Sequence, residues 1–292
     1  MDWFSLTLVC AFFLASADAV IKRFLSDYRA GELVVVRLVW TALPLCPLLL
    51  LQPWPALPPA FWGYMLLLVP MDLGAMWLYM QALRVSPLSH SIPYLAFTPV
   101  FNTVTARWLL GEQVKPAALL GILAVTAGAY MLNVDRVRGR GWRGWLEPLR
   151  FIVSEPGPRL MLAVSLIYSF TSTLSKAVLQ LVPASFLAPF YFTLLGVVAL
   201  GLAAIHAPSA ALRLLSRRPG VYLLIGVLMA GMSVTHFLAM AKVQVAYMIA
   251  VKRSSLLFSI GYGAWLFREQ RLWQHLTAGA VMVAGIILIA AC

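Results

Sequence analysis

"ARWLLGEQ" (residues 106–113) returns later in the chain as "AWLFREQ" (residues 264–270). One constant interval aligns the tryptophan and the glutamate of the first stretch with those of the second. Matches that recur in the same order over both halves of a chain indicate an internal repeat. The matched pairs are Gly74 and Gly231, Ala82 and Ala239, Trp108 and Trp265, Glu112 and Glu269, and Ala127-Gly128 and Ala284-Gly285; Lys22 and Lys176 also hold similar places near the front of each half.

The composition places this chain in a lipid bilayer. Hydrophobic residues make up 62% of it and charged residues only 11%, whereas a soluble protein has about 25% charged residues. The net charge is +12, but the basic residues lie mainly in short segments between apolar runs, as in membrane loops. We therefore expect a bilayer and no nucleic acid as partner. The three cysteines form neither a C-x-x-C motif nor an even framework, so no metal, cofactor or disulfide is expected.

Ten apolar runs approach the length of about 20 residues that a membrane-spanning helix needs. The runs are continuous rather than alternating, which favours helices over a transmembrane barrel. We predict an all-α polytopic membrane protein with two five-helix units, residues 1–133 and 159–292, joined by a basic linker at 134–158. The predicted spans are residues 3–22, 32–51, 61–83, 88–109, 116–133, 159–180, 184–206, 219–241, 245–267 and 273–291.

The N-terminal run also raises the question of a cleaved signal peptide, because "FFLASADA" contains the A-x-A spacing of a cleavage site. Asp2 stands where a signal peptide carries positive charge. The repeat also matches this segment to an uncleaved span, so we predict that it is the first helix.

An odd number of spans per unit has a topological consequence. The second unit must enter the membrane in the opposite sense, which gives inverted repeats around a shared central site. We expect spans one to four and six to nine to line a path, and spans five and ten to brace it. The small residues of these two bracing spans have small-xxx-small spacing, which favours close helix contact either inside one chain, as we expect, or at a dimer interface: Ala124, Gly128, Ala280 and Ala284. We expect a monomer or weak homodimer.

Several of these features together resemble a known family. They are the lysines that end spans one and six, Arg37 within "VVVRLVW", and the block "ALRVSPLSHSIPYLAFTPVFNTVTARWLLGEQ" (residues 82–113). The chain resembles the drug/metabolite transporter superfamily in its ten-helix form with two EamA-type repeats, over residues 3–133 and 159–291. The resemblance implies a multi-pass secondary transporter, which we expect in the bacterial inner (plasma) membrane. The second half departs from the first in having Arg268 before its glutamate and Leu256 where the first half has Pro99.

The distribution of basic residues indicates an orientation. The segments after the odd-numbered spans hold most of the lysines and arginines, which the positive-inside rule places in the cytoplasm. Both termini are then expected outside. The opposite side holds only Arg107, Lys115, Lys176 and Lys242.

Span nine, "YMIAVKRSSLLFSIGYGAWLF" (residues 247–267), carries two adjacent cations. A Lys or Arg at the centre of a membrane helix costs about 2.5–3.5 kcal/mol, so Lys252 and Arg253 need a polar cavity or a partner. With the hydroxyls of Ser254 and Ser255 they would suit an anion, because Arg offers a planar fork to phosphate or carboxylate and Lys adds a compact charge. The pair is also similar to that of the sugar-phosphate/phosphate translocators, whose further lysine in span four is absent here.

Other polar residues within the predicted spans complete the candidate site. The repeat interval places His236 on Tyr79, so both are expected at one cavity, together with Tyr94 and Arg37. Arg37 is the candidate substitute for the absent lysine; alternatively, it extends to the membrane interface.

Acidic residues within the spans offer alternatives to a binding role. Asp72 is either a protonatable residue that couples transport to a proton gradient or a counter-ion to Arg37, Lys252 or Arg253. Asp18 lies four residues before Lys22, which predicts an ion pair along one helix face.

Enzymatic function is not expected. The "GRGWRG" motif (residues 139–144) lies in the basic linker rather than in a βαβ unit, and no metalloprotease or nucleophile motif is present. The sequence therefore predicts a secondary transporter of a small organic anion, phosphorylated or carboxylated. The alternative is a broad exporter of amino acids or amphipathic metabolites.

Overall fold

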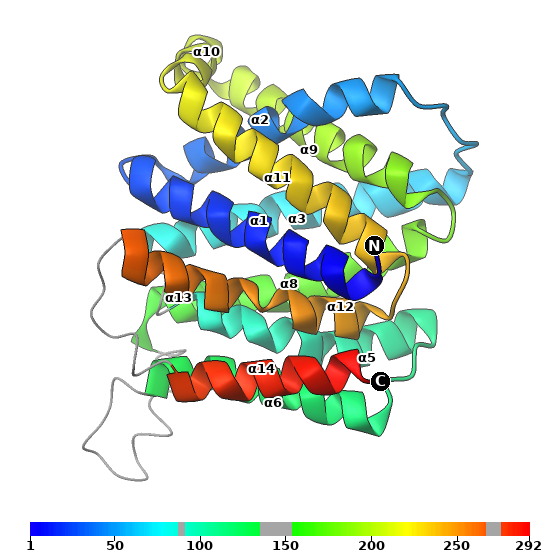
Figure 1. Ribbon diagram of the computed structural model, residues 1–292. Helices are drawn as coiled ribbons and strands as arrows, with labels where there is room; N and C mark the ends of the chain where they lie inside the picture. The colour runs from blue at the N-terminus through cyan, green and yellow to red at the C-terminus, as the bar shows by residue number, and fades with distance from the viewer. Residues whose placement is uncertain (87–90, 135–153, 267–275) are drawn as a thin grey trace.

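The computed structural model describes residues 1–86, 91–134, 154–266 and 276–292, and every element in these ranges is helical (Figure 1). Most of the predicted linker, including its G-x-G-x-x-G motif, and Glu269 lie outside the described residues. The first half contains α1 (Trp3–Phe24), α2 (Ala30–Leu50), α3 (Pro59–Val85), η1 (Ile92–Phe97), α5 (Thr98–Leu110) and α6 (Pro116–Val134). The second half contains α8 (Pro156–Val178), α9 (Ala184–His206), α10 (Pro208–Ser216), α11 (Pro219–Met240), α12 (Val245–Lys252), α13 (Ser255–Leu266) and α14 (Leu276–Ala290).

Six helices in the described part of the chain are long and apolar enough to cross a membrane: α1, α2, α3, α8, α9 and α11. Apolar stretches of α6 and α14 are shorter in the described residues. Many of the helices begin with proline, which has no N–H to lose in the first turn and already has the helical φ. The short helix α10 was not predicted.

Hydropathy predicted one continuous helix at residues 88–109 and another at residues 245–267. The structure instead divides each of these spans into two helices. In the first half, η1 is a 3₁₀ helix and its boundary with α5 carries Pro99, which has no N–H for the helix ladder. In the second half, the N–H groups of Arg253 and Ser254 bond three residues back, to Ala250 (3.1 Å) and Val251 (2.9 Å). The interval that aligns Trp108 with Trp265 also aligns the starts of α5 and α13.

Helix packing repeats between the two halves. The pairs with the most extensive contacts are α6 with α14 and α2 with α9, and Figure 1 shows each pair side by side. Next come α1 with α11 and α3 with α8. In both of these pairs the first predicted span of one half packs against the third predicted span of the other. Both termini lie on one side of the molecule (Figure 1).

The ends of the first helix in each half make the same kind of contact. Lys22 Nζ, on α1, donates to the carbonyl of Leu83 near the end of α3 (3.4 Å). Lys176 Nζ, on α8, donates to the carbonyls of Met240 (2.5 Å) and Val243 (3.0 Å) at the end of α11. A cation at a helix C-terminus satisfies carbonyls that have no partner within the helix. The two matched lysines therefore stabilise matched helix ends.

The close contact between α6 and α14 lies within one chain, as predicted. Gly121 faces the backbone of α14 so closely that a Cβ atom there would lie 2.7 Å from the carbonyl oxygen of Gly285, and the reverse contact would be 2.6 Å. Ala280 and Ala284, which were expected at this contact, are exposed instead. The α6–α14 pair borders the rest of the bundle as a brace.

Replacing Gly121 with alanine tests this brace. We expect Gly121→Ala to destabilise the protein by about 1–3 kcal/mol, because the helices must separate to admit the methyl group. Gly201→Ala on α9, where a Cβ would meet nothing within 4 Å, is the matched control. Thermal unfolding of the purified proteins in detergent measures both. Equal unfolding midpoints for the two variants would contradict the close contact.

Candidate functional site

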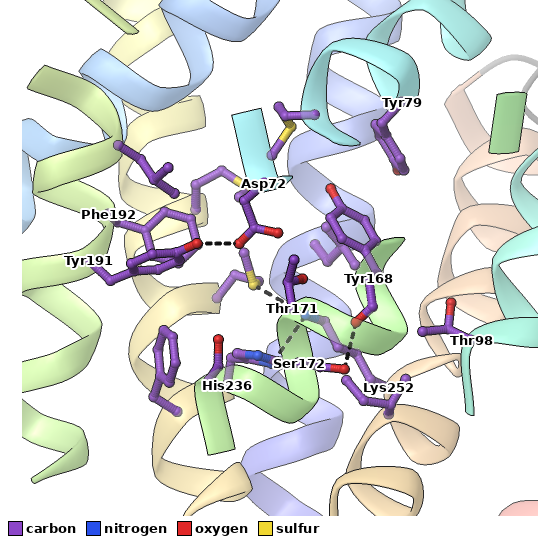
Figure 2. A pocket seen from close by; sticks show the side chains of 18 of the residues that line it. Asp72, Tyr79, Thr98, Tyr168, Thr171, Ser172, Tyr191, Phe192, His236 and Lys252 are labelled. Atoms are coloured by element: carbon purple, nitrogen blue, oxygen red, sulfur yellow. Dashed lines mark hydrogen bonds between the residues drawn. The ribbon is translucent and has the colours of Figure 1, made fainter. Parts of the chain in front are cut away.

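A central cavity of about 130 Å³ lies among the helices of both halves (Figure 2). Its lining comes from α1, α2, α3, η1, α5, α8, α9, α11 and α12 or residues beside them, and no described residue of α6 or α14 contributes. These are the helices of predicted spans one to four and six to nine. The polar lining residues are Arg37, Asp72, Tyr79, Thr98, Tyr168, Thr171, Ser172, Ser175, Tyr191, His236, Lys252 and Arg253.

Six of the nine candidate residues from the sequence therefore line one cavity: Arg37, Asp72, Tyr79, His236, Lys252 and Arg253. The other three do not line it. Tyr94 is buried, and its ring stacks with that of Phe97 (centroids 6.4 Å apart). Ser254 and Ser255 are buried at the junction between α12 and α13.

Lys252 is held by neutral groups. Its Nζ lies 3.2 Å from Nδ1 of His236 and 3.6 Å from Sδ of Met232 (Figure 2). If the ammonium donates to Nδ1, the imidazole must be the neutral tautomer with its proton on Nε2. No carboxylate in the described residues forms an ion pair with Lys252. Its charge therefore has polar contacts but no counter-charge.

Arg253 follows Lys252 at the helix break. Its side chain is buried, and its Nε has no hydrogen-bond partner among the described residues. No described acid lies within ion-pair distance of its guanidinium either. Both cations stand at the C-terminus of α12, where the helix dipole favours positive charge. A buried guanidinium without a carboxylate partner is costly, and a bound anion would remove that cost.

Asp72 is on the opposite side of the cavity from these contacts, on α3. The hydroxyl of Tyr191, on α9, donates to Asp72 Oδ2 at 2.5 Å (Figure 2). In the described part of the chain Asp72 forms no ion pair with Arg37, Lys252 or Arg253. The cavity thus has an acidic side as well as a basic side.

Arg37 has a partner that the sequence did not indicate. Its Nη1 lies 2.7 Å from Oδ1 of Asp18, and both side chains are buried, with exposed fractions of 3% and 6%. Tyr79 donates its hydroxyl to the other oxygen of Asp18 at 2.6 Å. The predicted pair between Asp18 and Lys22 is therefore wrong, because Asp18 faces α2 and α3 while Lys22 reaches the end of α3. Arg37 lies inside the bundle rather than at the membrane interface.

Positions aligned by the repeat meet in this cavity. The interval between Lys22 and Lys176 aligns Arg37 with Tyr191, and the interval between Trp108 and Trp265 aligns Tyr79 with His236 and Leu95 with Lys252. All six of these aligned residues line the cavity. The first half compensates its arginine internally with Asp18, whereas the second half presents Lys252 and His236 without an acid.

Residues of α8 form a polar wall that sequence reasoning missed. Tyr168, Thr171, Ser172 and Ser175 line the cavity from one face of this helix. The signal was present in "YSFTSTLS" (residues 168–175), where polar residues recur at i, i+3, i+4 and i+7 within an apolar helix.

Replacing the paired Arg37 and replacing the unpaired Lys252 should affect the stability of the protein differently. We expect Arg37→Gln to destabilise the protein by about 3–5 kcal/mol, because it leaves the buried Asp18 carboxylate without its partner. The double variant with Asp18→Asn recovers part of this loss. Lys252→Gln leaves stability unchanged or raises it, because it removes a charge that has only uncharged hydrogen-bond partners among the described residues. Thermal unfolding in detergent compares the three. An Arg37→Gln protein as stable as Lys252→Gln would refute the structural role of the pair.

Comparisons with known proteins show what parts of the chain resemble. Residues 1–134 match the EamA-like transporter family. No curated protein matches the chain. Among solved structures, one described only as "Crystal structure of protein" is 16% identical and aligns with a TM-score of 0.66 over 98% of each chain, which shows a shared fold across both halves. The first half thus resembles a family of membrane transporters, and six of the described helices are long and apolar enough to cross a membrane.

Proposed function

We propose that this protein is a secondary transporter that moves a small organic anion, phosphorylated or carboxylated, across the membrane. The observation that carries the proposal is the pair Lys252 and Arg253, which line a central cavity and have no described carboxylate partner. Each such charge costs about 2.5–3.5 kcal/mol within the membrane, so an anionic substrate would stabilise the site.

The other residues that line the cavity indicate the size and charge of the proposed substrate. Because Asp18 already compensates Arg37, two cations are left to hold an anionic group, which fits a single phosphate or carboxylate. The start of α5 at Thr98 also faces the cavity and adds the positive end of a helix dipole. Hydroxyls of α8 are suited to hydrogen-bond a polar substrate. A volume of about 130 Å³ is below the roughly 300–1,000 Å³ of drug-sized sites and suits a small metabolite.

Alternating access by two inverted five-helix repeats is the mechanism we infer. The aligned helix breaks and the exchanged packing pairs support ten spans in two related halves. One helix contact differs between the two halves. Helix α2 packs closely along α11, where a Cβ atom on Gly226 would meet the carbonyl of Trp40. The equivalent pair with the halves exchanged, α9 and α3, meets at few positions. Two inverted halves that exchanged these packings would expose the cavity to the other side.

The charge distribution supports an orientation for this transporter. Basic residues gather at the end where Tyr28 and Tyr222 share a hydrogen bond of 2.7 Å and Arg218 pairs with Asp27 at 3.3 Å. The positive-inside rule places that end in the cytoplasm and both termini outside. We infer a location in the bacterial inner (plasma) membrane, as a monomer or weak homodimer.

A second candidate function follows from Asp72. Because this acid lines the same cavity without a described cationic partner, an ammonium group could neutralise it while a carboxylate meets Lys252 and Arg253. The alternative is therefore an exporter of amino acids or other amphipathic metabolites.

Counterflow into liposomes tests the anion site. With purified protein and a panel of phosphorylated and carboxylated solutes, we expect Lys252→Gln and Arg253→Gln to lower uptake of the active solute at least tenfold, because the substrate charge is then only half compensated. Arg253→Lys retains part of the activity. Arg213→Gln, on the exposed surface of α10, is the matched control. Wild-type uptake by Arg253→Gln for every active anion would refute the proposal.

Asp72→Asn separates the two candidate substrates. For a purely anionic substrate we expect the KM to fall, because the variant removes a repelling charge while the amide oxygen still accepts from Tyr191. For an amino-acid-like substrate, uptake falls instead, because the ammonium group loses its counter-charge. Concentration dependence of counterflow measures both. An unchanged KM and an unchanged maximal rate would exclude Asp72 from either role.

A further inference from the structure

A second cavity, of about 500 Å³, lies at the end of the molecule that carries both termini. Its lining includes Trp3 and Cys292 near those termini, and it shares no lining residue with the central cavity. The ends of α8 and α14 and the starts of α1, α6 and α12 border it. N-terminal and C-terminal helix ends therefore meet here, and their dipoles oppose one another. The charged side chains thus decide whether the electrostatic potential in the cavity is positive or negative.

Those side chains are mostly lysines. Three of the four basic residues that the sequence assigns to this side line the cavity: Lys115, Lys176 and Lys242. Among the described lining residues the one acid is Glu112, whose Oε2 accepts the N–H of Val245 at the start of α12 (3.0 Å). No described ion pair joins this carboxylate to any of the lysines. The cavity therefore carries surplus positive charge.

Backbone carbonyls hold the three lysines in place. Lys176 donates to two of them at the end of α11, Lys242 donates to that of Met1 (3.0 Å), and Lys115 donates to that of Cys292 (2.5 Å). An ammonium group has three N–H donors, so each lysine keeps at least one for a ligand. Side chains that are already ordered lose less conformational entropy on binding.

The cavity lies close to the central one along two helices. On α8, Ser175 lines the central cavity and Lys176 the second; on α12, Ile249 lines the central cavity and Tyr247 the second. A solute that passed between the central cavity and this side of the membrane would meet the lysines about one helical turn away.

We propose that this second cavity is an anion-binding site for a phosphate group, carried by a small solute or by a lipid headgroup. As a site for a solute it would hold the anion at the outer mouth of the path, a role that rests on the proposed transport function. Binding itself does not depend on that function, because the lysines and the cavity are separate from Lys252 and Arg253.

Equilibrium binding of inorganic phosphate to the full-length protein in lipid nanodiscs tests the proposal. We expect two sites in the wild type, of which Lys252→Gln/Arg253→Gln removes one and Lys115→Gln/Lys176→Gln/Lys242→Gln removes the other. Arg107→Gln, the fourth basic residue of this side and no part of the lining, leaves both. Retention of both sites by the triple lysine variant overturns the proposal. Loss of only the central site with unchanged transport would instead overturn the proposed function.

A gentler variant covers the case in which the triple variant fails to fold. Glu112→Gln keeps an oxygen that can accept from Val245 but removes the one acid of the lining, so we expect phosphate to bind the second site at least threefold more tightly. Unchanged or weaker binding to Glu112→Gln overturns the proposal.

The lipid composition of the nanodiscs identifies the source of the phosphate. Equal binding in neutral and anionic nanodiscs assigns the site to a solute. Loss of the second site only in phosphatidylglycerol nanodiscs assigns it to a lipid headgroup that competes for the lysines. Absence of the second site in both overturns the proposal.

Discussion

A charged side chain inside this bundle requires either a counter-charge or a ligand, and this requirement organises the centre of the molecule. Hydrocarbon offers no water to solvate an ion, so each buried cation must be compensated by protein or by substrate. Arg37 has its compensation in Asp18, 2.7 Å away. Among the described residues Lys252 and Arg253 form no ion pair, and their charge is the property that would suit the cavity to an anion.

The two halves use one helical plan for these two different tasks. Matched helices pack in matched pairs, and the fourth predicted span of each half breaks at aligned positions, before Thr98 and before Ser255. At the break in the first half the residues are apolar, whereas the second half places Lys252 and Arg253 there. The two halves thus share a backbone arrangement but differ in charge. The first half supplies Arg37, which pairs with Asp18, and the second half supplies Lys252 and Arg253, which have no described counter-charge.

The periphery is built for close packing rather than for chemistry. Gly121 and Gly285 let α6 and α14 approach until backbone meets backbone, and neither helix contributes a described residue to the central cavity. Lys22 and Lys176 bind carbonyls at the ends of α3 and α11, the third predicted span of each half. Lys176 also lines the cavity near the termini, so one side chain belongs both to a structural contact and to that cavity.

Local pattern in the sequence was sufficient for the helical class and for six of the residues that line the central cavity. Hydropathy, residue spacing and the cost of an intramembrane charge are properties of a single segment, and they can be read without knowing its neighbours. Tertiary structure alone decided which charges are compensated, because Asp18 and Arg37 lie on different helices and meet only in the folded bundle. It also decided where helices break, that α8 supplies a polar wall, and that three distant lysines surround one cavity. Each of these depends on contacts between segments far apart in the chain, which no local pattern specifies.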